Sequence, residues 1–281
     1  MRRISLIFAV MAAMIMAVSC GSEKKENKES KFLVLYYSQT SNTKLVAEEI
    51  AKKLDANIEE IVPVKPYDGD FKATIDRCMK EREDGVIPKI KPLKSNIEKC
   101  GVIFLGFPVW FGTYAPPVAA FLKDYDLSGK KIIPFCTFGS GGLETSTMDL
   151  VKAQPNAKVV PGYGVRAARM DAMPAEVDQF LKENKIIPGE YAILEEFPDF
   201  HEVTEEEASI FNKATGDYPM MHAKAVMAAS RAIPNGTEYL FIAEDMPREM
   251  KDDMPPAGIM KVYVNLVKDE APVFTRVVRN K

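Results

Sequence analysis

The sequence FLVLYYSQTSNTKLVAEEI occupies residues 32–50. It starts with a continuous apolar and aromatic run up to Tyr37, which is typical of a strand covered on both faces of a sheet. Apolar residues then recur at four-residue intervals among charged ones as far as Leu54, which predicts an amphipathic helix over residues 43–54. A buried strand followed directly by such a helix indicates an α/β fold built around a parallel sheet.

The same alternation of strands and helices continues to residue 184. Further strands are predicted at residues 58–62, 101–109, 131–137 and 157–166, and further helices at residues 70–83, 116–123, 144–153 and 175–184. The pattern predicts a doubly wound, five-stranded parallel sheet in a domain that spans residues 32–185. Ligands of such sheets bind beyond the carboxyl ends of the strands, which draws attention to the loops after Tyr37, Gly106 and Thr137.

After Gly189 the alternation stops. A helix is predicted over residues 204–214, where Thr204 and Glu207 have the spacing of a capping box. Strand-like stretches follow at residues 224–233, 238–244, 259–267 and 273–279, and the first two are joined by a predicted turn at Asn235-Gly236. Residues 190–281 are therefore expected to form a small, separate α+β domain with antiparallel strands.

Every residue of the loop Ser38–Thr43, SQTSNT, carries a hydroxyl or an amide side chain. Free backbone N–H groups at a helix start, together with such donors, suit a phosphate group. The alternative is capping of the helix, which a single Ser, Thr or Asn would satisfy. The loop has neither a P-loop lysine nor GxGxxG spacing, which disfavours nucleoside triphosphates and dinucleotides.

Two later loops reach the same predicted edge of the sheet. Residues 107–117, FPVWFGTYAPP, carry the single tryptophan of the chain, Trp110, beside Phe111. These rings can form a platform for a flat ring, and core filling is the alternative. Residues 137–142, TFGSGG, combine three glycines with a serine, which permits close approach of the backbone to a ligand. Together the three loops predict one site for a phosphate and a flat ring.

The segment VLYYSQTSNTKLVAEEIA resembles the phosphate-loop signature of the flavodoxin family, and residues 106–142 are similar to the later segments of short-chain flavodoxin-like proteins. The resemblance covers about residues 31–184 and implies the strand order 2-1-3-4-5 and an FMN cofactor. It places the phosphate on the first loop and the isoalloxazine ring between the second and third loops. Ser41 stands where many members have glycine.

The cofactor-binding residues expected from this resemblance are Ser38, Gln39, Thr40, Ser41, Asn42, Thr43, Pro108, Val109, Trp110, Phe111, Gly112, Thr137, Phe138, Gly139, Ser140, Gly141 and Gly142. No catalytic nucleophile and no metal site are expected, because the chain has only two histidines and no motif that pairs one with a hydroxyl or a thiol.

The amino terminus has the layout of an export signal. A basic pair precedes an apolar run that ends at Val18 and is shorter than the roughly 20 residues of a membrane-spanning helix, so residues 1–19 are predicted to be a signal peptide. The following AVSC sequence resembles the lipobox of bacterial lipoproteins, which implies a lipid on Cys20; cleavage with an unmodified Cys20 is the alternative. Residues 20–31 are small and charged and predict a flexible tether. The protein is thus expected at the bacterial cell envelope, anchored to the membrane through Cys20.

The formal net charge of −3 leaves no basic surplus for nucleic acid. The leading hypothesis is an FMN-binding electron-transfer protein whose partner is a redox protein or a membrane quinone. The alternatives are an FMN-dependent NAD(P)H:quinone-type reductase and a binding lipoprotein without flavin. The export signal favours the first, because NAD(P)H is scarce outside the inner membrane. The carboxyl-terminal domain is faintly similar to cystatin-like folds, and the sequence predicts no role for it.

Overall fold

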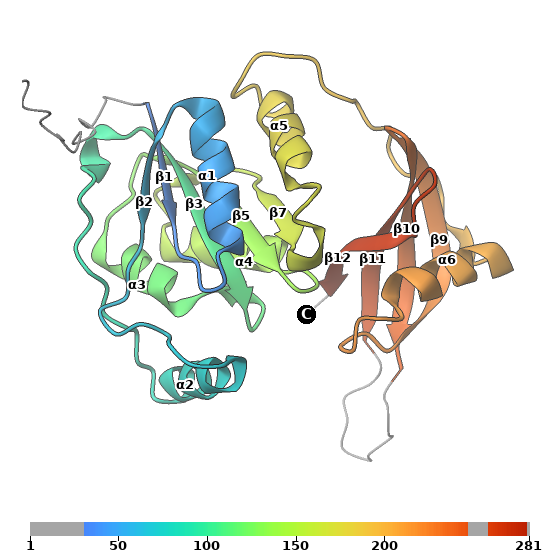
Figure 1. The fold of residues 1–281 in the computed structure, drawn as a ribbon, viewed down its shortest axis with the longest axis horizontal. Coiled ribbons are helices and arrows are strands. Elements are labelled where there is room, and N and C mark those ends of the chain that lie inside the picture. The colour runs from blue at the N-terminus through green and yellow to red at the C-terminus, as the bar shows by residue number, and fades with distance from the viewer. Residues whose placement is uncertain (1–30, 247–257, 280–281) are drawn as a thin grey trace, which may run out of the picture.

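The computed structural model describes residues 31–246 and 258–279, which form two sheets with separate cores (Figure 1). The strands of the first sheet are β1 (Phe32–Tyr36), β2 (Asn57–Glu60), β3 (Val102–Trp110), β4 (Thr113–Tyr114), β5 (Lys131–Phe138), β6 (Lys158–Val159) and β7 (Tyr163–Arg166). Its helices are α1 (Asn42–Leu54), α2 (Phe71–Glu83), α3 (Pro116–Asp124), α4 (Leu143–Ala153) and α5 (Met173–Glu183).

The first sheet runs in the order β2-β1-β3-β5-β6, with β7 also paired to β5 and the short β4 antiparallel to β3. All its other pairings are parallel. The doubly wound fold class predicted from the strand and helix periodicity is confirmed, and the strand order is the 2-1-3-4-5 that the family resemblance implies.

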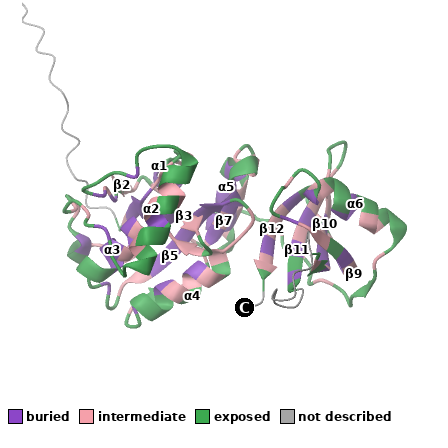
Figure 2. Ribbon diagram, turned by 90° about the horizontal axis from the view of Figure 1, so that it is seen from below, coloured by how far each residue is buried: buried purple, intermediate pink, exposed green. Residues whose placement is uncertain are grey.

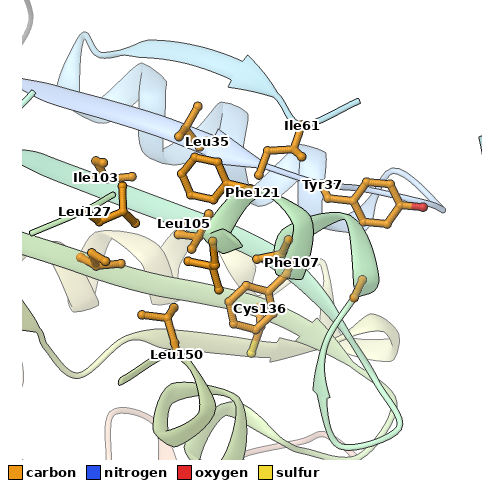
Figure 3. Close-up of a cluster of buried hydrophobic side chains, with 14 of the residues drawn as sticks. Leu35, Tyr37, Ile61, Ile103, Leu105, Phe107, Phe121, Leu127, Cys136 and Leu150 are labelled. Atoms are coloured by element: carbon orange, nitrogen blue, oxygen red, sulfur yellow. The ribbon is translucent and has the colours of Figure 1, made fainter. Parts of the chain in front are cut away.

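Both faces of this sheet are buried, as the apolar runs predicted. In β1, Leu33 and Leu35 face the core beneath α3 and α4, whereas Val34 and Tyr36 face the core beneath α1 and α5. Figure 3 shows the first of these cores, in which Phe121 of α3 lies among the leucines and isoleucines of the strands. Figure 2 shows the buried residues gathered along the strands and the exposed ones on the outer faces of the helices. The strict alternation in β1 follows from the two-residue period of a strand.

The last predicted strand, residues 157–166, is broken in two. β6 pairs with the first two residues of β5 and β7 with the last four, and the bonding is interrupted opposite Pro134. Pro161 lies in the gap between β6 and β7. Neither proline has an N–H to give to a strand ladder, which explains why one predicted strand became two.

The helix α2 does not cover a face of the sheet. It belongs to the excursion between β2 and β3, and Figure 1 shows it beyond the carboxyl ends of the strands. Asp70 caps this helix, since its carboxylate accepts a hydrogen bond from the N–H of Ala73 at 2.8 Å. The start of α2 is thereby brought to the edge at which the loops of interest lie.

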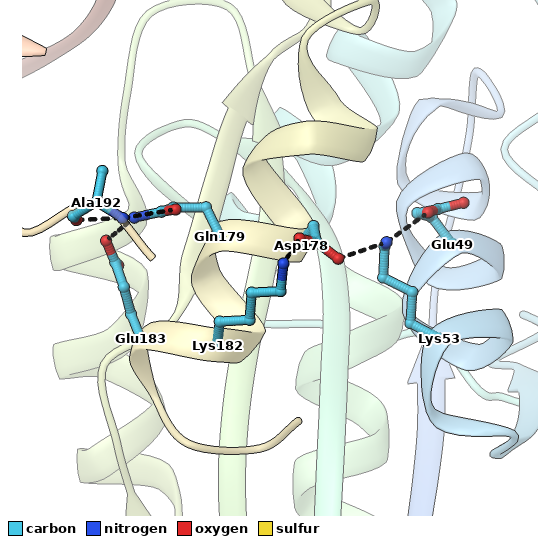
Figure 4. A network of polar contacts seen from close by, with 7 residues as sticks. All are labelled: Glu49, Lys53, Asp178, Gln179, Lys182, Glu183 and Ala192. Atoms are coloured by element: carbon cyan, nitrogen blue, oxygen red, sulfur yellow. Dashed lines mark hydrogen bonds and ion pairs between the residues drawn. The ribbon is translucent and has the colours of Figure 1, made fainter. Parts of the chain in front are cut away.

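Ion pairs join helices α1 and α5, which cover the same face of the first sheet. Lys53 of α1 lies 2.8 Å from Asp178 of α5, which also pairs with Lys182 at 2.7 Å (Figure 4). At the next residue of α5, the side-chain amide of Gln179 donates to the carbonyl of Ala192 at 2.9 Å and accepts from its N–H at 3.3 Å. The segment that leads to the second sheet is therefore fixed to α5 at Ala192.

The second sheet is antiparallel and belongs to the carboxyl-terminal part of the chain. Its strands β8 (His201–Glu202), β9 (Ala223–Ile233), β10 (Gly236–Asp245), β11 (Ile259–Val267) and β12 (Val273–Arg279) follow the order β12-β11-β10-β9-β8. The helix α6 (Glu205–Thr215) packs on one face and starts with the predicted capping box. The α+β architecture predicted for this region is confirmed.

One turn in this sheet differs from the prediction. Ile233 pairs with Gly236, so the two loop residues of the β9–β10 hairpin are Pro234 and Asn235 rather than Asn235 and Gly236. Asn235 has a φ of 65° and takes the left-handed position of the turn. Proline followed by a residue with positive φ is typical of a type II turn, which displaces the expected Asn-Gly pair by one residue.

The predicted signal peptide, the lipid site Cys20 and nearly all of the tether lie outside the described residues, as do residues 247–257. Within residues 31–246 and 258–279, the structure contains no helix that is both long enough and apolar enough to cross a bilayer.

Candidate functional site

A pocket of about 420 Å³ lies at the carboxyl ends of β1, β3 and β5. Its volume falls within the roughly 300–1,000 Å³ that small-molecule sites occupy. It is lined by Gln39, Thr40, Asn42, Gly69, Asp70, Phe71, Thr74, Pro108, Val109, Trp110, Thr137, Phe138, Gly139 and Ala167. All three loops singled out in the sequence therefore contribute to one cavity at the topological switch point of the sheet.

The first loop presents an open helix terminus to this pocket. α1 starts at Asn42, and the preceding Ser41 makes no side-chain capping bond. The N–H of Lys44 donates to the hydroxyl of Ser38 at 3.3 Å, whereas the N–H groups of Asn42 and Thr43 have no acceptor among the residues that the structure describes. Unpaired N–H groups at the positive end of a helix can bind an anion.

Ser41 bends the loop in the way that a glycine would. Its φ of 67° lies in the left-handed region, which costs a non-glycine residue roughly 1–2 kcal/mol. Ser41 therefore adopts the backbone conformation that a glycine takes readily, although it carries a side chain.

The side chain of Thr43 joins two of the loops, whereas its backbone N–H lies at the open start of α1. Its hydroxyl lies 2.8 Å from the hydroxyl of Thr137, and both side chains are buried. The pair joins the first loop to the third from beneath the pocket. Of the two, only Thr137 also lines the pocket.

The second loop places Trp110 in the pocket wall. Tyr37 and Tyr67 meet its ring edge-on, with centroids 5.8 Å and 5.3 Å away. Tyr67 is fixed in turn by a hydrogen bond from its hydroxyl to Glu81 and by the guanidinium of Arg77, which lies 3.7 Å from the centre of its ring. Trp110 is therefore held by packing in one orientation, as a stacking platform requires.

Gln39 is turned toward this aromatic group. Its side-chain carbonyl accepts from the hydroxyl of Tyr37 at 2.7 Å, and its amide donates to the backbone carbonyl of Tyr67. Burial raises the pKa of both tyrosines, so their hydroxyls stay protonated and uncharged at neutral pH. Gln39 thus connects the first loop to the Trp110 wall.

Phe111 and Gly112 form the tip of a tight hairpin between β3 and β4. Trp110 pairs with Thr113, so these two residues are the whole loop, and their φ values are 52° and 79°. Positive φ at both positions is the requirement of a type I′ turn, which favours Asn-Gly. Phe111 is therefore strained. It does not line the pocket; its ring is half exposed and lies 5.4 Å from the guanidinium of Arg82.

The third loop is divided between two cavities. Thr137, Phe138 and Gly139 line the pocket itself. Ser140, Gly141 and Gly142 line a neighbouring cleft of about 590 Å³, which shares Val109 and Gly139 with the pocket and also contains Phe111 and Gly112. The far wall of this cleft is formed by Tyr218, Met220 and Val277–Arg279 of the carboxyl-terminal domain.

One wall of the pocket comes from residues that the sequence did not indicate. Gly69, Asp70, Phe71 and Thr74 reach it from the start of α2, and Ala167 reaches it from the end of β7. The exposed ring of Phe71, with 82% of its surface accessible, is the largest apolar group at this rim. The sequence predicted a helix over residues 70–83, but no pattern indicated that this helix would lie at the carboxyl edge.

The chemistry that the pocket can support is that of binding. Its lining offers hydroxyl, amide and backbone donors with an aromatic wall, and Asp70 is its only charged side chain among the described residues. The carboxylate of Asp70 already accepts a helix-capping bond. The lining therefore suits a ligand with one anionic group and a flat, mostly apolar ring.

The family model of flavodoxin matches residues 31–179 of the chain. A candidate flavoprotein from Bacteroides eggerthii is 30% identical over 53% of this chain and 96% of its own, with a TM-score of 0.46. A second from Bacteroides uniformis is 26% identical over 54% of this chain and 99% of its own, with a TM-score of 0.48. A flavoprotein from Lactobacillus acidophilus in complex with FMN is 24% identical over 48% and 93%, with a TM-score of 0.43. No curated protein matches the chain.

Proposed function

Because the chain belongs to the flavodoxin family, whose model matches residues 31–179, we propose that it binds FMN and serves as an electron-transfer protein at the cell envelope. The observation that carries the proposal is that all three expected loops line one pocket of about 420 Å³. Each end of this pocket offers the chemistry that one part of FMN needs.

The first loop fits the phosphate. The free N–H groups of Asn42 and Thr43 and the polar side chains of Thr40 and Asn42 form a cradle at the start of α1. No lysine or arginine lines the described pocket, so the phosphate would be held by helix-terminal and hydroxyl donors. Such a cradle discriminates between FMN and riboflavin, which lacks the phosphate.

The second and third loops fit the ring. Trp110 supplies an aromatic wall that Tyr37 and Tyr67 hold in place. Phe138 and Gly139 stand at the third loop, where backbone donors can approach the polar edge of a flavin. The apolar lining excludes water from a ring bound there, and exclusion of water disfavours an added negative charge on that ring.

FMN supplies one- and two-electron redox chemistry when it is bound, and the protein supplies binding, orientation and electrostatics. The described pocket presents no histidine and no lysine that could transfer a proton. The tyrosines behind Trp110 stay protonated because burial raises their pKa. The site therefore suits transfer of electrons to or from a partner better than acid–base chemistry on a substrate.

The proposed role is that of a carrier whose partner is a redox protein or a membrane quinone. Support comes from the export signal and from the absence of a dinucleotide motif in the sequence. A steady-state assay with NADH and menadione tests this role on the FMN-loaded protein. A carrier shows no turnover until a partner reductase is added, whereas sustained turnover with NADH alone would establish the reductase alternative.

A visible spectrum of the purified chain, lacking residues 1–19, tests the cofactor itself. Absorbance at the flavin bands after purification, or after FMN is added and the excess removed, supports FMN binding. A colourless protein that takes up no FMN would contradict both the electron-transfer and the reductase hypotheses. The hypothesis of a binding lipoprotein without flavin would then remain.

The envelope location is proposed from the signal sequence and the lipobox at Cys20. The intact mass of the mature protein from membranes should exceed that of the polypeptide by the mass of the lipid. Cys20→Ser should abolish this addition and release the protein from the membrane fraction. A membrane-bound protein whose mass equals that of the bare polypeptide would rule out the anchor.

A further inference from the structure

Arg166, the last residue of β7, bridges the two domains. Its Nε donates to the carbonyl of Gly139 at 2.8 Å, and its Nη1 donates to the carbonyl of Phe274 in β12 at 2.8 Å. Gly139 belongs to the third loop of the pocket, whereas Phe274 belongs to the carboxyl-terminal domain. One guanidinium therefore holds a wall of the pocket against the second sheet.

The charge of Arg166 is buried without a carboxylate. The side chain is 7% exposed, and no ion pair joins it to an acidic group among the described residues. The guanidinium instead lies 3.3 Å from the centre of the Phe274 ring and 5.5 Å from that of Tyr218. Burial lowers its pKa to about 10, so it remains a cation at neutral pH. A buried cation with only carbonyl and aromatic partners is costly to maintain, which points to a role beyond packing.

The contacts also orient the backbone of the third loop. The carbonyl of Gly139 accepts from Arg166, and the carbonyl of Ser140 accepts from the N–H of Val277 at 2.6 Å. In a trans peptide the C=O and the following N–H point in opposite directions. The N–H groups of Ser140 and Gly141 are therefore turned away from these partners, and none of the described residues accepts a bond from them.

The two domains approach each other closely, and the segment that connects them is held by hydrogen bonds to both domains. A Cβ on Gly141 would overlap the carbonyl oxygen of Val277, so only glycine permits this approach of the loop to β12. The connecting segment is fixed to α5 at Ala192. Farther along, Arg231 of β9 donates to the carbonyl of Glu195 at 2.9 Å. The second domain is thus attached to the first at both the loop and the linker.

We propose that Arg166 is a positioning residue that makes the carboxyl-terminal domain a structural part of the flavin site. Resting on the proposed FMN function, this assignment gives residues 190–281 a role, because their β12 strand fixes the third loop at Gly139, which lines the pocket. The N–H groups of Ser140 and Gly141, in the adjoining cleft, are then left for the edge of the flavin ring. The retained cation beside Gly139 also favours the electron-rich reduced flavin. FMN affinity and midpoint potential then both depend on a contact outside the α/β domain.

Two substitutions at Arg166 separate its charge from its geometry. Arg166→Gln removes the cation, and Arg166→Lys retains it without the two-pronged hydrogen bonding. We expect Arg166→Gln to weaken FMN binding at least tenfold and to lower the midpoint potential. Arg166→Lys should weaken binding but keep a potential closer to that of the wild type. Wild-type affinity and potential in Arg166→Gln would overturn the proposal.

A matched control and a substitution from the other domain guard against misfolding. Arg169→Gln removes a neighbouring arginine that bonds to Glu176 within the α/β domain, and FMN affinity should stay within twofold. Phe274→Leu removes the ring beneath the guanidinium without altering the α/β domain. It should weaken FMN binding in the same direction as Arg166→Gln, and unchanged binding in Phe274→Leu would overturn the role of the second domain.

Small-angle scattering of the FMN-free proteins distinguishes failure of this inference from failure of the proposed function. Arg166→Gln and Phe274→Leu should each increase the radius of gyration relative to the wild type and to Arg169→Gln, because the domains separate. A wild type that binds no FMN would refute the proposed function, and the scattering comparison would still test the domain contact. Unchanged scattering in both variants would refute that contact.

Discussion

The hydroxyls of Thr43 and Thr137 lie 2.8 Å apart, although 94 positions separate the two residues in the chain. Thr43 lies in the first turn of α1, and Thr137 is the penultimate residue of β5. Both are at least 95% buried. This hydrogen bond sets the spacing of the first and third loops, and therefore the distance between the phosphate cradle and the ring wall in the proposed site.

Replacement of both threonines of this pair by valine should cost less stability than the sum of the two single replacements. Thr43→Val or Thr137→Val leaves a buried hydroxyl without a partner, which costs about 1–3 kcal/mol of unfolding free energy. The double variant leaves no unpaired hydroxyl, so its loss should be smaller than the sum of the single losses. Urea unfolding of the four proteins measures this difference, and strictly additive losses would show that the two hydroxyls do not interact.

Trp110 should contribute most of the stacking energy of the flavin ring. Trp110→Ala removes the wall that Tyr37 and Tyr67 support, and loss of an aromatic stacking partner costs about 1–3 kcal/mol. Trp110→Phe keeps a ring and should retain most of the affinity. Flavin fluorescence titrations give both dissociation constants, and a Trp110→Ala variant with unchanged affinity and potential would remove Trp110 from the site.

Phe111→Asn should stabilise the protein by about 1 kcal/mol. Phe111 occupies the first position of the β3–β4 turn with a φ of 52°, where Asn is favoured and an aromatic residue is strained. Asn235, with a φ of 65°, provides the reverse control. Asn235→Phe should destabilise the β9–β10 hairpin. Thermal unfolding of both variants checks the signs, and destabilisation by Phe111→Asn would show that the ring contributes more than its strain costs.

The ion pairs of Asp178 should give stability that disappears in acid. Hydrogen bonds from Lys182 and Lys53 hold the pKa of this carboxyl below its ordinary value of 3.8. Its contribution is therefore complete above that ordinary value and is lost as the pH falls through the lowered pKa of the folded state. At pH 7 the unfolding free energy of the wild type should exceed that of Asp178→Asn by up to about 1 kcal/mol. The difference is small because the ion pairs are partly exposed.

Urea unfolding of the wild type and Asp178→Asn at a series of pH values tests this dependence. The two curves should converge at low pH. Asp149→Asn removes a surface pair within α4 and should change the stability less. A difference between the wild type and Asp178→Asn that persists unchanged to low pH would show that charge is not its cause.

Much of the fold was readable in the sequence, because each core strand carries its own burial pattern. The run from Phe32 and the run from Val102 are apolar on both faces, and both strands lie inside the sheet with helices on either side. The break between β6 and β7 was not predicted, because it depends on Pro134 of β5 lying beside the segment that contains Pro161 and Gly162. A single-strand pattern does not record which residue lies opposite.

The candidate site was predictable only where its residues follow strands directly. Thr40, Trp110 and Gly139 each come after a core strand or at its end, and the pocket contains all three. Phe71 comes from an excursion whose path is fixed by tertiary contacts, and Arg166 meets a partner 108 residues away. Those contacts are long-range, and neither hydrophobic period nor turn chemistry encodes them.

The most direct test of the FMN site uses Trp110, the single tryptophan of the chain. Titration of the purified protein with FMN, followed by tryptophan fluorescence, should give saturable quenching at one FMN per chain. Riboflavin should bind more weakly, because it has no phosphate for the cradle at Asn42. Absence of saturable quenching by FMN, or equal binding of both compounds, would contradict the site described here.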